Sequence, residues 1–115
     1  MDRFGKEFYE FLFANSPEYK TLFRRDASEQ EAMLGHTLHQ IVAALDDGAR
    51  LKSLLVNLGR LHAGYGINEQ DFAVVEGAFL HAASRILDGA WTEDVQSAYC
   101  AFYRFSGGVM IDAMR

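Results

Sequence analysis

A single histidine stands in a stripe of leucines near the end of a predicted helix. The stripe has the spacing of one helix face, with steps of four, three and four residues: Leu51, Leu55, Leu58 and His62. Gly64 and Gly66 follow directly and are expected to end the helix. A neutral imidazole at the edge of an apolar slot can serve as the one axial ligand of a haem iron. A buried histidine that is merely hydrogen-bonded would give the same pattern, so the spacing alone leaves both interpretations open.

Apolar side chains would have to hold the faces of a haem ring beside His62. The residues that could do so on this side are Leu58, Leu61, Ile67, Phe72 and Val75. The backbone carbonyl of Leu58 lies one helical turn before His62, so it can accept a hydrogen bond from the imidazole. That bond would fix which ring nitrogen carries the proton.

Three residues could act on the far side of such a ring. Tyr9 lies among phenylalanines, and its hydroxyl needs a partner if it is buried. Gln30 carries two amide donors, and Leu34 lies one turn further along the same predicted helix. We expect Tyr9 and Gln30 to donate hydrogen bonds to a bound diatomic gas. The alternative is a core tyrosine with its hydroxyl at the rim and a solvated glutamine.

Other chemistries have weaker support. His36 and His39 are one turn apart, but no third ligand has matching spacing, so two exposed histidines are expected. His81 is expected to be a packed or rim histidine. Cys100 is the only cysteine, which excludes an internal disulfide, a zinc–cysteine cluster and covalent haem attachment through Cys-x-x-Cys-His. Paired Glu-x-x-His motifs, glycine-rich phosphate loops and serine nucleophile motifs are absent from the sequence.

The elements that must position these residues are predicted to be helices. The chain has 115 residues, 50% hydrophobic and 13% aromatic, with one proline and no β-type alternation. Helices are expected over about residues 2–15, 28–45, 49–64, 69–87 and from 93 onwards, with caps at Ser28, Asn68 and Thr92. Their inward stripes include Leu45, Ile86 and Phe105. We therefore predict one all-α domain over residues 1–115.

Charge and hydropathy narrow the partners. The formal net charge is −5 without a basic cluster, which argues against nucleic acid or an anionic membrane as the main partner. No apolar run reaches membrane-spanning length, and the start Met1-Asp2 does not resemble a signal peptide. The expected location is the cytoplasm.

Taken together, the motifs resemble the globin family, specifically its bacterial single-domain and flavohaemoglobin branch. The segments that carry the resemblance are Phe8–Phe13 with Ser16-Pro17-Glu18 and Leu22-Phe23, Gln30–Leu34, Arg60-Leu61-His62 with Tyr65-Gly66-Ile67, and Trp91-Thr92-Glu93. The resemblance implies a three-on-three helical sandwich that holds haem b (iron protoporphyrin IX) with His62 as proximal ligand. It further implies that Tyr9 and Gln30 are distal residues and that Phe23 stacks on the haem.

Two departures from the family pattern matter. The chain begins where the family's second helix begins, so the first helix is expected to be shortened or absent. Apolar surface left uncovered in this way would favour a homodimer or another partner. The family's tyrosine and glutamate behind the proximal histidine correspond here to Phe72 and Met114, so peroxidase-like bond cleavage is less favoured.

Three functions follow as hypotheses. The first is reversible binding of O2, NO and CO by a haem b globin, for oxygen transport or gas sensing. The second is nitric oxide dioxygenation or redox chemistry at the same haem with an external reductase. The third is a globin-fold interaction module without haem.

Overall fold

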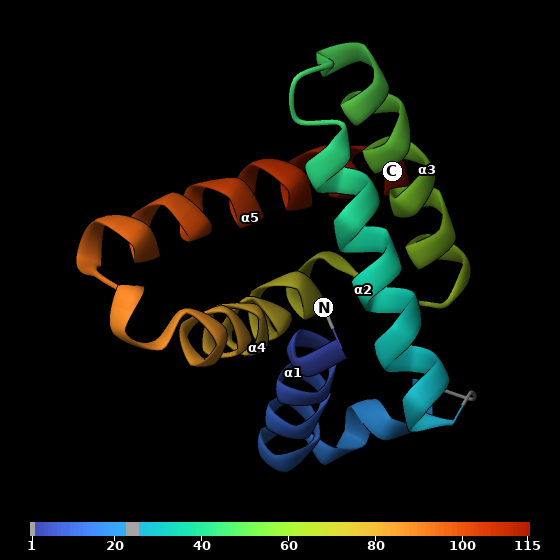
Figure 1. Ribbon diagram of the computed structural model, residues 1–115. Helices are drawn as coiled ribbons and strands as arrows, with labels where there is room; N and C mark the ends of the chain where they lie inside the picture. The colour runs from blue at the N-terminus through green and yellow to red at the C-terminus, as the bar shows by residue number, and fades with distance from the viewer. Residues whose placement is uncertain (1, 23–25) are drawn as a thin grey trace.

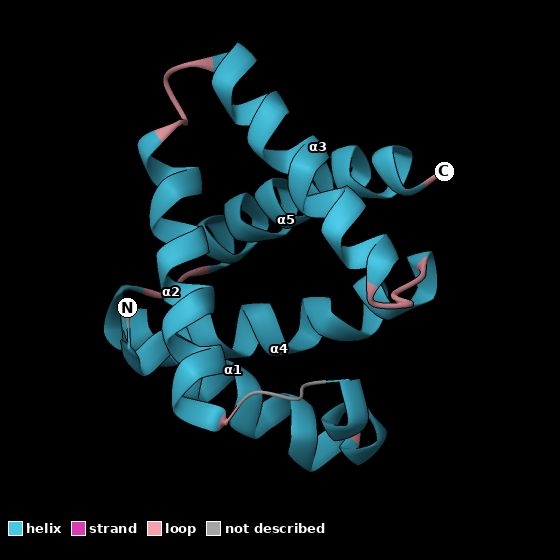
Figure 2. Cartoon of the chain, turned by 90° about the vertical axis from the view of Figure 1, so that its right-hand side faces the viewer, coloured by secondary structure: helices cyan, strands magenta, loops and turns pink. Residues whose placement is uncertain are grey.

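The computed structural model describes residues 2–22 and 26–115, and within these ranges it is helical without strands (Figures 1 and 2). Its elements in chain order are α1 (Asp2–Asn15), the 3-10 helix η1 (Pro17–Leu22), α2 (Ala27–Ala43), α3 (Gly48–Gly64), α4 (Glu69–Leu87), the 3-10 helix η2 (Asp88–Ala90) and α5 (Glu93–Met114). The five predicted helices are therefore confirmed. None of the described helices is long and apolar enough to cross a membrane.

The helices pack in two principal pairs. α1 packs most extensively on α4, and α3 on α5, while α2 lies against α1. Figure 2 shows α2 and α3 diverging from the short connection between them. Because α2 runs toward this connection and α3 away from it, the first turn of α2 and the last turn of α3 both lie at the far ends of the two helices. These turns carry Gln30 and His62 respectively.

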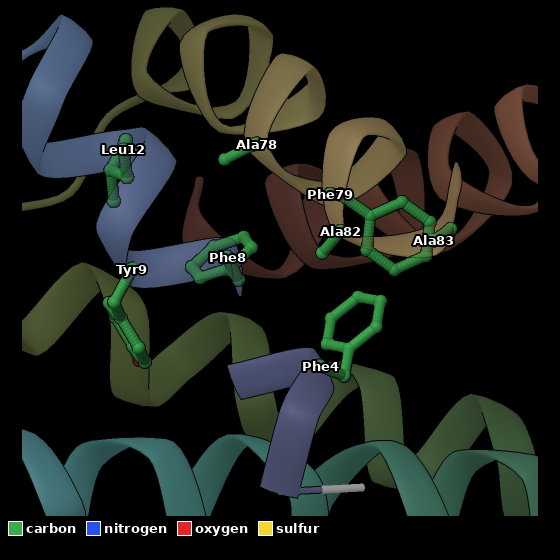
Figure 3. Close-up of a cluster of buried hydrophobic side chains, with 8 residues drawn as sticks. All are labelled: Phe4, Phe8, Tyr9, Leu12, Ala78, Phe79, Ala82 and Ala83. Atoms are coloured by element: carbon green, nitrogen blue, oxygen red, sulfur yellow. The ribbon is translucent and has the colours of Figure 1, made fainter. Parts of the chain in front are cut away.

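Two clusters of buried side chains form the core. The α1–α4 cluster, drawn in Figure 3, consists of Phe4, Phe8, Tyr9, Leu12, Ala78, Phe79, Ala82 and Ala83. The α3–α5 cluster consists of Ile41, Ala44, Leu51, Leu55 and Met110. Phe102 packs against both clusters and so joins them. Each large apolar side chain that is fully buried stabilises the fold by about 1.5–3 kcal/mol.

Two glycines let helices cross at short range. A Cβ on Gly5 of α1 would lie 2.8 Å from the carbonyl oxygen of Glu31 on α2. A Cβ on Gly59 of α3 would lie 2.9 Å from Cα of Met110 on α5. Because real Cβ atoms do not approach backbone this closely, both crossings depend on the absence of a side chain.

The helix caps agree with the sequence in two places and differ in one. Asn68 accepts from the first turn of α4 in a capping box, and Thr92 accepts from Val95 N–H, both as predicted. The cap predicted at Ser28 is wrong. α2 begins earlier, because Asp26 has extended backbone and its carboxylate accepts the N–H of Glu29 at 3.0 Å.

Three residues predicted to face inward are exposed instead. Leu45 is 52% exposed because α2 ends at Ala43 and the following turn buries Ala44 in its place. Ile86 is 36% exposed in the last turn of α4, and Phe105 is 57% exposed on α5. Phe105 precedes the buried Ser106, so it projects from the flank of the helix rather than into the core.

Candidate functional site

His62 occupies the last turn of α3 with its imidazole half-buried. Its Nδ1 lies 2.6 Å from the carbonyl oxygen of Leu58, one turn earlier, which confirms the bond expected from the sequence. A carbonyl oxygen can only accept, so the proton of the neutral ring is on Nδ1. Nε2 then carries the lone pair, which is the state in which histidine ligates a metal.

The backbone turns away immediately after this histidine. α3 ends at Gly64, and Gly66 adopts a φ of +79°, which favours glycine. The N–H of Gly66 donates to the Ala63 carbonyl at 3.1 Å, and that of Ile67 donates to the His62 carbonyl at 3.2 Å. These two bonds form a Schellman motif, so the carbonyl of His62 is fixed at the helix end.

Phe72 of α4 lies beside the imidazole. The two ring centroids are 6.0 Å apart at an interplanar angle of 43°. The Tyr103 hydroxyl donates to the Phe72 carbonyl oxygen at 2.5 Å, and a Cβ on Gly107 would lie 3.4 Å from the Phe72 ring. Tyr103 and Gly107 of α5 therefore hold Phe72 next to His62.

Tyr103 is a residue of this site that sequence reasoning missed. It is half-buried, and burial, with the charge of Glu76 as a smaller cause, raises its pKa above the usual range. The one available signal was a tyrosine within the apolar stripe of the last helix, because such a hydroxyl needs a partner.

Tyr9 is 9% exposed and belongs to the α1–α4 cluster. Its side chain leaves α1 on the side away from α4, unlike Phe4 and Phe8 (Figure 3). Burial raises the pKa of Tyr9 to about 12, and the negative charge of Glu31 contributes in the same direction. The phenol therefore stays protonated at ordinary pH and can act as a hydrogen-bond donor.

The two predicted partners of Tyr9 lie on α2. Leu34 is half-buried and packs against the α1–α4 cluster, so the structure brings it together with Tyr9. Gln30 is half-buried one turn before Leu34 and directly precedes Glu31, whose charge acts on Tyr9. These three side chains thus belong to the region where α1 meets α2.

The predicted apolar contacts are distributed over both clusters. Leu58 and Phe72 pack against the α3–α5 cluster, and Val75 packs against the α1–α4 cluster. Ile67 is half-buried, whereas Leu61 is 56% exposed. Phe23 lies outside the described residues.

The remaining histidines have other surroundings. His36 and His39 are exposed on α2, as expected. His81 stacks on Phe11 with ring centroids 4.3 Å apart, and its Nε2 lies 3.7 Å from Oε2 of Glu7. The prediction of a packed rim histidine is therefore confirmed. Within residues 2–22 and 26–115, no three His, Cys, Asp or Glu side chains gather to hold a metal ion.

The residues around His62 fit haem b. One imidazole has its tautomer fixed by a backbone carbonyl, an aromatic ring lies beside it, and half-buried apolar residues follow in the next helix. Haem needs this combination of one nitrogen ligand and apolar contacts rather than a cluster of protein ligands.

Comparisons with known proteins agree with this donor set. A family model described as Globin matches residues 6–110. The chain is 31% identical to a neuroglobin from Dissostichus mawsoni, over 86% of the chain and 71% of that protein. It is 24% identical to a flavohemoprotein from Rhizobium meliloti (strain 1021), over 85% of the chain but only 25% of that protein's length.

A solved structure gives the same result for the fold. It is the crystal structure of a hexacoordinated heme protein from an anhydrobiotic tardigrade at pH 4, with a TM-score of 0.83 and 26% sequence identity. The superposition covers 100% of the chain and 83% of that structure. The all-α, globin-like fold that the sequence pattern predicts is therefore confirmed.

Proposed function

The chain belongs to the globin family, and from this premise we propose that it holds haem b at His62 and reversibly binds O2, NO and CO. The observation that carries the proposal is the 2.6 Å contact between Nδ1 of His62 and the Leu58 carbonyl oxygen. Because this bond keeps the proton on Nδ1, Nε2 can ligate iron without a change of tautomer. Haem iron held by one axial histidine supplies an open coordination position for a diatomic gas.

The other residues of the site have distinct proposed roles. Leu58, Ile67, Phe72 and Val75 would hold the ring and exclude water, and the resemblance adds Leu61 and Phe23 to this set. On the gas side, Tyr9 and Gln30 would donate hydrogen bonds, and Leu34 would limit the space. The protonated state of Tyr9 supports its role, because a phenolate could not donate.

The partner of Nδ1 favours reversible binding over turnover. A backbone carbonyl is neutral, and the side chain next to the imidazole is Phe72 rather than a hydroxyl or carboxylate. His62 is then close to a neutral imidazole, which is a weaker electron donor than one hydrogen-bonded to a carboxylate. Nitric oxide dioxygenation with an external reductase is thus the less supported function. A homodimer and a reductase partner stay predictions.

The branch within the family is also a proposal. The residues Tyr9, Gln30 and Leu34 support the bacterial single-domain type. The relatives include neuroglobins as well as flavohemoproteins, so the family alone does not separate oxygen transport from gas sensing.

The first experiment is the visible absorption spectrum of the purified chain with added haem, before and after dithionite and CO. We expect a Soret band that shifts on addition of CO, that is lost in His62→Gly and that returns when imidazole is supplied in solution. His36→Ala is the matched control, because this histidine is exposed on α2 and should leave the spectrum unchanged. No Soret band in the wild type would reject haem binding and favour the interaction module.

The number of axial ligands is tested separately. The structural neighbour is described as hexacoordinated, whereas in this chain the residue facing Tyr9 from α2 is a glutamine and the other histidines are exposed or stacked on Phe11. We expect CO to bind the reduced protein at a rate that rises linearly with CO concentration. A rate that saturates would reveal a competing protein ligand and contradict the assignment of Gln30.

A further inference from the structure

Tyr19 of η1 and Asp71 of α4 make a hydrogen bond that plays no part in the proposed gas binding. The Tyr19 hydroxyl donates to Oδ1 of Asp71 at 2.6 Å, between residues 52 positions apart in the sequence. The second carboxylate oxygen, Oδ2, accepts the backbone N–H of Asn68 at 2.9 Å. Asp71 therefore joins η1 to residues 65–68, which we call the α3–α4 corner.

The α3–α4 corner is in turn tied to His62. The N–H of Ile67 donates to the His62 carbonyl oxygen at 3.2 Å. A continuous series of hydrogen bonds and one peptide link thus runs from Tyr19 through Asp71 and Asn68 to the backbone of His62. Because α3 packs mainly on α5, the bonds at this corner determine how its last turn meets α4.

The ring of Tyr19 contacts a different part of the site from its hydroxyl. The ring packs against the α1–α4 cluster, which contains Tyr9. The hydroxyl bond to Asp71 is charge-assisted and therefore stronger than a bond between neutral groups. The same bond is the main cause that raises the pKa of Tyr19 to about 12. One side chain thus connects the Tyr9 cluster with the α3–α4 corner.

We propose that Tyr19 and Asp71 form a clasp that fixes the α3–α4 corner, and with it the orientation of His62, relative to the α1–α4 cluster. Tyr19 is then a positioning residue for the axial histidine, although it touches neither His62 nor its ligand. The assignment to haem rests on the proposed function, whereas the clasp itself is a property of the chain. Without the hydroxyl, Asp71 keeps only one of these two partners and the corner opens more often.

Amide hydrogen exchange tests the clasp directly in the full chain, with and without haem. In Tyr19→Phe we expect the N–H groups of Ile67 and Asn68 to exchange about tenfold faster, because one hydrogen bond to a charged acceptor is lost. Tyr99→Phe is the matched control, since this tyrosine packs its ring against Phe79 and Trp91. It should leave both amides unchanged.

Asp71→Asn provides the second arm. If the two side chains act as one unit, adding Tyr19→Phe to Asp71→Asn should accelerate exchange little beyond Asp71→Asn alone. Fully additive effects would mean that the two residues act independently, and the clasp would be wrong. Unchanged exchange at Ile67 in Tyr19→Phe would overturn it as well.

The link to His62 has its own measurement. We expect haem transfer from Tyr19→Phe to an excess of a competing haem-binding protein to be about tenfold faster than from the wild type. Faster amide exchange with unchanged haem transfer would refute the coupling to His62. If the wild type takes up no haem, the proposed function fails, while amide exchange in the haem-free chain still decides the clasp.

Discussion

Replacing Gly59 by alanine tests whether the crossing of α3 and α5 sets the position of His62. A Cβ at Gly59 would lie 2.9 Å from Cα of Met110 and closer still to its carbonyl oxygen. Carbon atoms pack at about 3.5 Å or more, so the helices would have to separate by roughly half an ångström. Both contacts are with backbone, so no side-chain rotation relieves them.

Two opposing effects determine the expected free energy of unfolding. Alanine is the better helix former by about 1 kcal/mol. Overpacking a close contact costs about 1–3 kcal/mol, and here the separation would also loosen the α3–α5 cluster. We expect a net loss of about 1–2 kcal/mol, or a Tm lower by roughly 4–8 °C. Because His62 follows Gly59 by about one turn of α3, haem transfer should also be faster.

Gly64→Ala is the matched control within the same helix, since a Cβ there meets nothing within 4 Å. Urea unfolding followed by circular dichroism should give it a stability equal to the wild type, or higher by about 0.5–1 kcal/mol. If Gly59→Ala is as stable as Gly64→Ala, the two helices do not meet in close contact at Gly59. The argument from this crossing to the position of His62 would then be refuted.

Three further predictions concern single residues. Tyr9→Phe should raise the oxygen dissociation rate in stopped-flow measurements about five- to thirtyfold, since a hydrogen bond of about 1–2 kcal/mol is lost; an unchanged rate would transfer the donor role to Gln30 or water. The pKa of Tyr9, about 12, lies above its ordinary value of 10.0, so its contribution to stability is full below pH 10 and is lost as the pH rises through 12. The loss should amount to roughly 2 kcal/mol, and alkaline unfolding curves of Tyr9→Phe should lack this share. Asp88→Gly should raise the urea midpoint by an amount equivalent to about 1 kcal/mol, because Asp88 has a φ of 45° that glycine adopts without strain, and a lower midpoint would contradict this.

The sequence predicted those features that depend on neighbours within a turn or two. The five helices, the cap at Asn68 and the stop after His62 follow from hydrophobic spacing and from the geometry of helix ends. The bond from His62 to the Leu58 carbonyl belongs to the same class, because helix geometry alone brings residues four apart together.

Prediction failed where two local choices were comparable or where exposure depended on a neighbouring helix. Ser28 and Asp26 can both cap a helix, and the extended backbone at Asp26 decided between them. Phe105 has the composition of a core residue, but the buried flank of α5 is the one with Ser106 and Met110. Helix periodicity defines a face only approximately, and packing chooses which side of it is covered.

The sequence by itself therefore determined the helices, the family pattern and the tautomer of the axial histidine. Only the tertiary structure decided which distant residues support that histidine: Tyr103 against Phe72, Gly59 against Met110, and Tyr19 against Asp71. The physical reason is the range of the interactions. Backbone geometry fixes contacts between residues close in sequence, whereas contacts between residues 31 or 52 positions apart exist only after the helices have crossed at particular points.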